Sequence, residues 1–345
     1  MSFILSSISS EWERLINGLS PVHSLLTTPD DDRDSITSIF LPNEYIFGTF
    51  VPAVLIVAFS LTIIYNVSFN FVHLILPKEE QVSKIDKSKA AYQITNCIFN
   101  VIVGIVGLYQ YFIVIPNLQK DQDDNEFIST VIGYHYELYH ISALQLGYQI
   151  FVLPICIFVI NENIEMIFHH FAVVFSTGTS GLLIIGFRYY IPYFYGIFEL
   201  SSIPLSIMNH IKLHPKLKSE YPNLFTLSRN IFAISFIVIR IICSPGPKFI
   251  RDCFIVMYTT PNNGSTTNTF IKLYLFIQVC FATFLQLLQI YWASLIMKGL
   301  LKVLTGSGDP VETETGKRTQ RCSRGGLAAH IAPRRVRTWP CSANR

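Results

Sequence analysis

Long apolar stretches separated by short polar connections set the pattern of this chain. A bilayer core of about 30 Å needs roughly 20 mostly apolar residues per helix. On that template the pattern predicts seven membrane-spanning helices, at residues 48–74, 91–115, 141–160, 167–187, 188–208, 224–243 and 270–297. The sequence therefore predicts an all-α integral membrane protein with about seven transmembrane helices.

The two ends of the chain differ from the middle. Residues 1–46 are too polar to span a membrane, but their apolar residues recur at helical spacing and predict a short interfacial helix. A first transmembrane helix is expected within residues 47–76. Residues 303–345 are rich in Gly, Ser, Thr, Arg and Pro and show no periodicity, which predicts a disordered basic tail.

Basic residues in the connections predict the orientation of the chain. The connection 77–89 holds four lysines and the connection 209–223 holds three, whereas residues 121–126 are acidic. By the positive-inside rule, both lysine-rich connections and the C-terminus are cytosolic, and the N-terminus is lumenal. The glycosylation sequon that begins at Asn263 falls in a connection that the charge count places on the lumenal side.

Composition excludes several classes of function. Half of the residues are hydrophobic and only 14% are charged, as in a membrane protein. The segment after Lys302 carries eight Lys/Arg and three Asp/Glu, so the rest of the chain has a net charge of −2 against +3 for the whole. No nucleic-acid partner is expected. The seven cysteines show no metal-ligand spacing, and we expect neither a metal nor a cofactor.

Two adjacent histidines, His169 and His170, open the predicted fourth span. Ionisable side chains inside a bilayer cost free energy and usually face the bundle interior, which makes this pair the first candidate for function. Glu165 precedes His169 by four residues and is expected to orient it from the same helix face. Adjacent helical residues point about 100° apart, so the pair does not suit one metal ion. The alternative is that histidines near a helix end contact lipid headgroups.

Glu199 lies well inside the predicted fifth span and needs a partner or a proton there. Three further polar residues, Arg229, Gln286 and Gln289, fall in the same cytosolic half of the membrane. Arg240, near the far end of the predicted sixth span, is interpreted as a residue that reaches back to the membrane surface.

Histidines elsewhere in the chain suggest a competing hypothesis, a membrane di-iron enzyme in which His135 and His140, and His210 and His214, would join the His169-His170 pair as ligand boxes. The predicted topology places the first group on the lumenal side and the second in a cytosolic loop, so they cannot meet at one metal pair. A seven-helix receptor is disfavoured because span three lacks an Asp-Arg-Tyr end and span seven lacks an Asn-Pro-x-x-Tyr sequence.

Residues 85–302 resemble the TLC domain family, the helical membrane domain shared by ceramide synthases and translocating-chain-associated membrane proteins. The resemblance is carried, in this order, by Phe168-His169-His170 with its Ser/Thr-rich continuation, Phe198-Glu199-Leu200-Ser201-Ser202, Arg240, and Gln289-Ile290-Tyr291-Trp292. It implies a location in the endoplasmic reticulum or a related membrane and a bundle around a lipid-accessible cavity.

The resemblance also implies roles for individual residues. In ceramide synthases the histidine pair belongs to the motif for acyl transfer from coenzyme A to a long-chain base, so His169 and His170 would be catalytic. About thirty residues later, those enzymes carry His-Asp and a further Asp, where this chain has Phe198-Glu199 and Ser201-Ser202. The chain is therefore closer to the TLC-domain-containing proteins that regulate membrane lipid composition.

Three functions follow from these observations. The first is lipid homeostasis through a lipid bound in a cytosol-facing cavity, with headgroup contacts from Glu199, Ser201, Ser202, Arg229, Gln286 and Gln289 beside the histidines. The second is an acyl-CoA-dependent N-acyltransferase, with a long-chain base and fatty acyl-CoA as substrates. The third is a cargo or chaperone role in the secretory pathway. The sequence leaves the lipid and the oligomeric state open.

Overall fold

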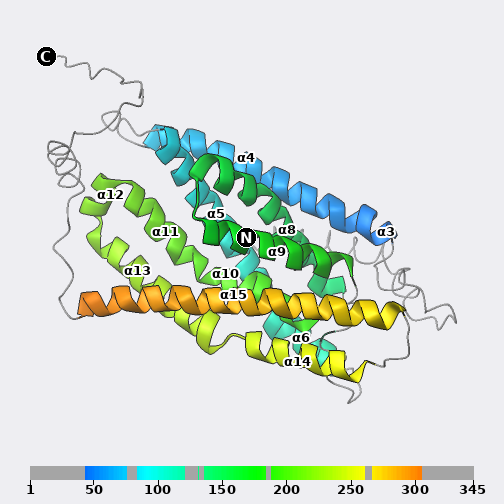
Figure 1. Cartoon of the computed structure of the whole chain (residues 1–345). Helices are drawn as coiled ribbons and strands as arrows, with labels where there is room; N and C mark the ends of the chain where they lie inside the picture. The colour runs from blue at the N-terminus through cyan, green and yellow to red at the C-terminus, as the bar shows by residue number, and fades with distance from the viewer. Residues whose placement is uncertain are drawn as a thin grey trace, which may run out of the picture. The chain divides into compact units, whose positions relative to one another are not determined.

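The computed structural model describes residues 43–75, 84–120, 131, 136–183, 188–260 and 266–304. These residues are almost wholly helical (Figure 1). The predicted interfacial helix before residue 43, the sequon at Asn263 and the predicted tail lie outside the described residues. Residues up to Ile296 form one compact unit, and residues from Met297 onward belong to a second one.

The described helices follow one another with few interruptions. In chain order they are α3 (Asn43–Tyr45), η2 (Ile46–Phe50), α4 (Val51–Ile75), α5 (Lys84–Tyr109), η3 (Gln110–Val114), α6 (Ile115–Lys120), α8 (Tyr136–Ile155), η4 (Cys156–Ile160), α9 (Ile164–Leu182), η5 (Arg188–Tyr190), η6 (Tyr193–Ile197), α10 (Phe198–Leu200), α11 (Ser202–Leu213), α12 (Pro215–Glu220), α13 (Pro222–Phe236), η7 (Ile237–Ile242), α14 (Gly246–Thr259) and α15 (Thr266–Leu304).

Five stretches of the described chain are long and apolar enough to cross a membrane. They are Ile46–Val72, Asp86–Gln119, His140–Ile160, Pro222–Thr259 and Asn268–Leu301. The protein is therefore an all-α integral membrane protein, as the sequence predicts. Each of the five overlaps an expected span, but the expected count of seven is not confirmed.

The expected spans at 167–187 and 188–208 are not among these five, for physical reasons visible in the chain. Helix α9 carries two histidines and a run of hydroxyl side chains, which lower its apolar character. The second stretch is divided into η5, η6, α10 and α11. Pro192 lies where η6 begins, and Pro204 lies in the first turn of α11, where a missing backbone N–H is tolerated.

Close packing brings the interrupted segment against the continuous helices. Helix α8 packs against α4 and α9, α5 packs against α4 and α11, and α11 packs against α13. Helix α5 also contacts η6 at two glycines, where a methyl group on Gly107 would lie 2.6 Å from Cα of Gly196. Only a residue without a side chain permits this approach, which holds α10 beside α5.

Apolar side chains face outward and amides face inward in this fold. Phe59 and Ile63 of α4 are exposed, as lipid-facing residues are, whereas Asn100 of α5 and Gln145 and Gln149 of α8 are buried. Inside a membrane protein, buried polar side chains hold helices together or line a site. The buried amides of α5 and α8 therefore indicate where a functional site could lie.

Candidate functional site

A cavity of about 350 Å³ lies among six helical segments. Its walls come from the first half of α5, the end of α8, the start of α9, the segment α10–α11, the segment α13–η7 and residues 292–296 of α15. Met166, Phe236 and Trp292 supply apolar lining, so the cavity is amphipathic.

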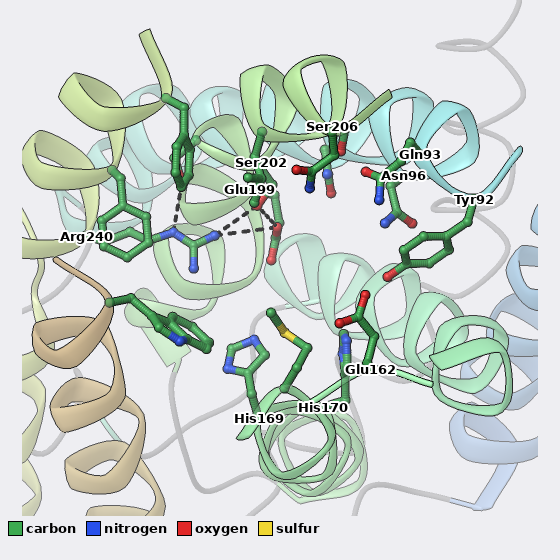
Figure 2. Close-up of a pocket in the computed structure, with 18 of the residues that line it drawn as sticks. Tyr92, Gln93, Asn96, Glu162, His169, His170, Glu199, Ser202, Ser206 and Arg240 are labelled. Atoms are coloured by element: carbon green, nitrogen blue, oxygen red, sulfur yellow. Dashed lines mark hydrogen bonds and ion pairs between the residues drawn. The ribbon is translucent and has the colours of Figure 1, made fainter. Parts of the chain in front are cut away.

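Arg240 forms the charged wall of this cavity together with α10 and α11 (Figure 2). Its Nε donates to Ser201 Oγ at 2.8 Å, and its Nη2 donates to Ser202 Oγ and to the carbonyl oxygen of Phe198, both at 3.0 Å. Its Nη1 donates to Gln289 Oε1 at 3.4 Å. The guanidinium carbon also lies 5.3 Å from the ring centroid of Phe198. Every guanidinium nitrogen is therefore engaged.

Glu199 is the counter-ion of Arg240. Its Oε2 lies 3.7 Å from Arg240 Nη2 and accepts a hydrogen bond from Ser202 Oγ at 2.8 Å. Its Oε1 accepts a long hydrogen bond of 3.5 Å from Gln145 Nε2. The expectation that Glu199 needs a partner is met by a cation. A charge pair in such surroundings persists only when hydrogen bonds satisfy the remaining atoms, as the serines do here.

The snorkelling interpretation of Arg240 is wrong. The residue is only 7% exposed and binds the interior of the bundle. The sequence analysis ended this span at residue 243, and the helix does end there, because η7 stops at Ile242 and α14 begins at Gly246. Arg240 lies in the last turn of η7, and its side chain turns inward to Glu199 instead of outward to the membrane surface.

His169 projects from α9 into the cavity and has an unused nitrogen. Its ring lies edge-on to Trp292, with centroids 5.4 Å apart. Its buried Nδ1 has no hydrogen-bond partner among the described residues. Glu165, the expected orienting residue, is exposed, and no hydrogen bond joins the two side chains. Because a buried nitrogen without a partner is costly, His169 is suited to bind a ligand.

His170 also lines the cavity, but the protein itself satisfies both of its nitrogens. Nδ1 lies 2.8 Å from Gln149 Oε1, and Nε2 lies 3.7 Å from Cys156 Sγ. Tyr92 Oη lies 3.5 Å from the same sulfur. Figure 2 shows Tyr92 and Asn96 on the side of the cavity opposite Arg240. The two adjacent histidines therefore stand in different surroundings.

The His170 side of the cavity is rich in amides that the sequence analysis missed. Tyr148 Oη donates to Asn96 Oδ1 at 3.2 Å, and its ring stacks on Phe99 with centroids 4.2 Å apart. Asn100 Oδ1 is buried without a hydrogen-bond partner in the described part of the chain. A signal was available in the sequence, since Asn96 and Asn100 are four residues apart on one face of an apolar helix.

A second cavity of about 60 Å³ shares His169, Glu199 and Arg240 with the first. Gln145 Oε1 and Ser176 Oγ, both on its lining, are buried atoms that lack a hydrogen-bond partner among the described residues. Its volume suffices for a few water molecules or for a small polar group. The three shared residues thus stand between two polar spaces.

The other expected site residues divide into three groups. Ser201 and Ser202 line the main cavity. Gln286 and Gln289 line only the second cavity, and Gln286 Oε1 accepts a hydrogen bond from Ser244 at 3.4 Å. Arg229 lines neither cavity. The structure therefore does not bring Arg229 together with the other candidates.

Of the other histidines of the di-iron hypothesis, the structure describes His140, His210 and His214, and none of these three lines either cavity. His210 and His214 lie together at the end of α11, with ring centroids 5.0 Å apart. Burial lowers the pKa of His210, and the neighbouring His214 adds to the shift. Among the described residues, which exclude His135, no group of three or more His, Cys, Asp or Glu is placed to hold a metal ion.

Comparison with families of known proteins gives a match. A family model described as the TLC domain matches residues 89–298, well over half of the 345 residues. Comparison with curated proteins gives no match. The matched region contains every residue of both cavities. The resemblance drawn from the sequence motifs is confirmed, and the chain is a multi-pass membrane protein that belongs to the TLC domain family.

Proposed function

We propose that this protein binds a membrane lipid in the main cavity and acts in membrane lipid homeostasis. The observation that carries the proposal is the amphipathic lining of the cavity. Unpaired polar atoms of His169 and Asn100 lie beside the apolar side chains of Met166, Phe236 and Trp292. Ligand sites typically have volumes of about 300–1,000 Å³ and a mostly apolar wall with a few convergent polar groups.

In this proposal, the headgroup of the lipid lies at the polar atoms of the cavity. His169 and the amides of α5 contact the headgroup, while Glu199, Ser201 and Ser202 shape the wall through Arg240. Every guanidinium nitrogen of Arg240 already donates a hydrogen bond within the protein. Arg240 is therefore better placed to stabilise the cavity wall than to bind an anionic group of the ligand. The acyl part of the lipid packs against Phe236 and Trp292.

The cavity faces the cytosol in this proposal, with a lumenal N-terminus and a cytosolic C-terminus. The support is that the lysine-rich connections 77–89 and 209–223 adjoin α5 and α11, which both line the cavity. The protein then resides in the endoplasmic reticulum or a related endomembrane, as the family resemblance implies.

N-acyl transfer of the ceramide-synthase type has less support. That hypothesis needs a carboxylate to orient a histidine. Glu199 instead bonds Arg240 and Ser202, and Gln149 bonds His170. Lipid binding leaves the contacts of Glu199 and the contact between Gln149 and His170 as they are in the structure.

The test is lipid co-purification. Protein purified in a mild detergent should retain a defined lipid class by mass spectrometry, and His169→Ala should lower the retained amount several-fold. His210→Ala is the matched control, because His210 lines neither cavity. Equal lipid content in the wild type and in His169→Ala would refute this assignment of the headgroup site.

A further inference from the structure

The second cavity carries polar atoms that lipid binding in the main cavity leaves unused. Gln145 Oε1 and Ser176 Oγ belong to its lining, and neither atom has a hydrogen-bond partner among the described residues. Each of the two residues is only 2% exposed. Because a buried polar atom without a partner costs free energy, two such atoms on one small cavity indicate that a bound group completes them.

Gln145 offers this cavity an acceptor, and its contact with Glu199 fixes that orientation. The side-chain amide nitrogen of Gln145 lies 3.5 Å from Glu199 Oε1. As the counter-ion of Arg240, Glu199 is ionised and can only accept a hydrogen bond. The amide nitrogen must therefore face Glu199, and Oε1 is the atom left without a partner. The missing partner has to bring a proton.

Ser176 differs from the other hydroxyl residues of α9. The side chains of Thr177, Thr179 and Ser180 donate to backbone carbonyl oxygens of their own helix, at 2.7, 2.8 and 3.1 Å in that order. In the described part of the chain, Ser176 Oγ makes no such bond. A serine hydroxyl can both donate and accept. Together with Gln145 Oε1, it suits a group that donates one hydrogen bond and accepts another.

The charges on the lining exclude a charged group. A phosphate would bring a negative charge to a wall where every nitrogen of Arg240 is already bonded. An ammonium would bring a positive charge to a wall where Glu199 already has its cation. A charge without a partner is costly in such surroundings. With a cavity of about 60 Å³, the group is both small and uncharged. A hydroxyl meets all of these conditions.

We propose that the second cavity is the subsite for an uncharged hydroxyl group at the end of the lipid headgroup. The hydroxyl donates to Gln145 Oε1 and accepts from Ser176 Oγ. The proposal rests on the proposed function, because the second cavity adjoins the main one through His169, Glu199 and Arg240, and the main cavity holds the rest of the lipid. A buried water molecule offers the same chemistry, so the test separates these two sources.

The test compares two lipids that differ only at this hydroxyl. Full-length protein in detergent micelles receives an equal mixture of dioleoylglycerol and its methyl ether, and native mass spectrometry measures how much of each is bound. The wild type should prefer the free hydroxyl by about fivefold or more, the ratio that corresponds to one hydrogen bond. Dioleoyl phosphatidate, added in the same way, should bind no better than the ether.

Variants of α9 locate this preference in the second cavity. Ser176→Val places methyl groups in the cavity and should abolish the preference. Ser176→Ala removes only the hydroxyl and should reduce the preference, and it also serves where the larger change prevents folding. Thr177→Val is the matched control, because Thr177 bonds its own helix and lines neither cavity, and it should keep the full preference.

Two results overturn the proposal. The first is equal binding of the two lipids by the wild type. The second is an undiminished preference in Ser176→Val and Ser176→Ala, which would leave the second cavity to water alone. Lipid that co-purifies from the cell membrane is measured in parallel. Its presence without the hydroxyl preference overturns only this proposal, whereas its absence in the wild type overturns the proposed function.

Discussion

The two sides of the main cavity are built on opposite principles. The Arg240 side places a full ion pair inside the bundle and satisfies it with serines and a backbone carbonyl. The His170 side is built from a thiol, a phenol, an imidazole and amides, with the carboxyl group of Glu162 beside His170 (Figure 2) and no arginine or lysine on its lining. The charged side can be broken by one substitution that leaves a bare charge, whereas the His170 side should lose stability in smaller steps.

The largest effect is expected from Arg240→Met. The change leaves Glu199 without its cation in a site where its side chain is only 16% exposed. Removing one partner of a buried pair costs about 3–5 kcal/mol. Denaturant unfolding in detergent micelles should show this loss, and Arg240→Met combined with Glu199→Gln should recover part of it. Arg229→Met is the control. An equal loss of stability in that variant would show that the ion pair does not account for the effect of Arg240→Met.

Ser202→Ala should cause the next largest loss of stability on the charged side. Its hydroxyl donates to Glu199 and accepts from Arg240, so two charge-assisted hydrogen bonds are lost together. A hydrogen bond to a charged group contributes about 1.5–3 kcal/mol. Ser235 bonds only the carbonyl oxygen of Phe232 in its own helix, and Ser235→Ala should cost less. Indistinguishable unfolding curves for the two variants would contradict this account of the wall.

The His170 side is tested by comparing its two histidines. His170→Ala leaves Gln149 Oε1 buried without a donor, which costs about 1–3 kcal/mol. His169 has no such bond at Nδ1, so His169→Ala should affect stability less and lipid content more. Thermal unfolding and lipid mass spectrometry on both variants separate the roles. The reverse pattern would show that His170 is the ligand contact.

Glu165→Ala should have the smallest effect. The sequence paired Glu165 with His169, but the side chain is exposed. An exposed substitution away from bonded partners usually changes stability by less than about 0.5 kcal/mol. A larger loss in unfolding experiments, or a loss of retained lipid, would restore the expected pairing.

Several features of the fold were predictable because they depend on local composition. Helices and their membrane character follow from long apolar runs, and five expected spans overlap helical stretches of the structure. The two remaining expected spans were predicted as continuous apolar helices. In the structure, hydroxyl side chains weaken the apolar character of α9, and the second stretch is interrupted near Pro192. Hydropathy alone does not predict where a helix is interrupted.

The site was predictable where a charge stood alone in an apolar run. His169, His170 and Glu199 stood out for that reason, and all three line the main cavity. Arg240 was misjudged because a side chain in the last turn of a helix can turn outward or inward, and only the packed structure places Glu199 and Ser201 beside it. Gln149 and Cys156 were missed because an uncharged polar residue in a helix has meaning only once its tertiary partner is known.

The most direct test of the lipid cavity fills it without touching the ion pair or the histidines. Ser206 is a buried residue on the cavity lining. Ser206→Trp should occupy the space and remove most of the lipid that co-purifies with the wild type, while Ser235→Trp, outside both cavities, should retain it. Undiminished lipid in a folded Ser206→Trp protein would contradict the claim that this cavity holds the lipid.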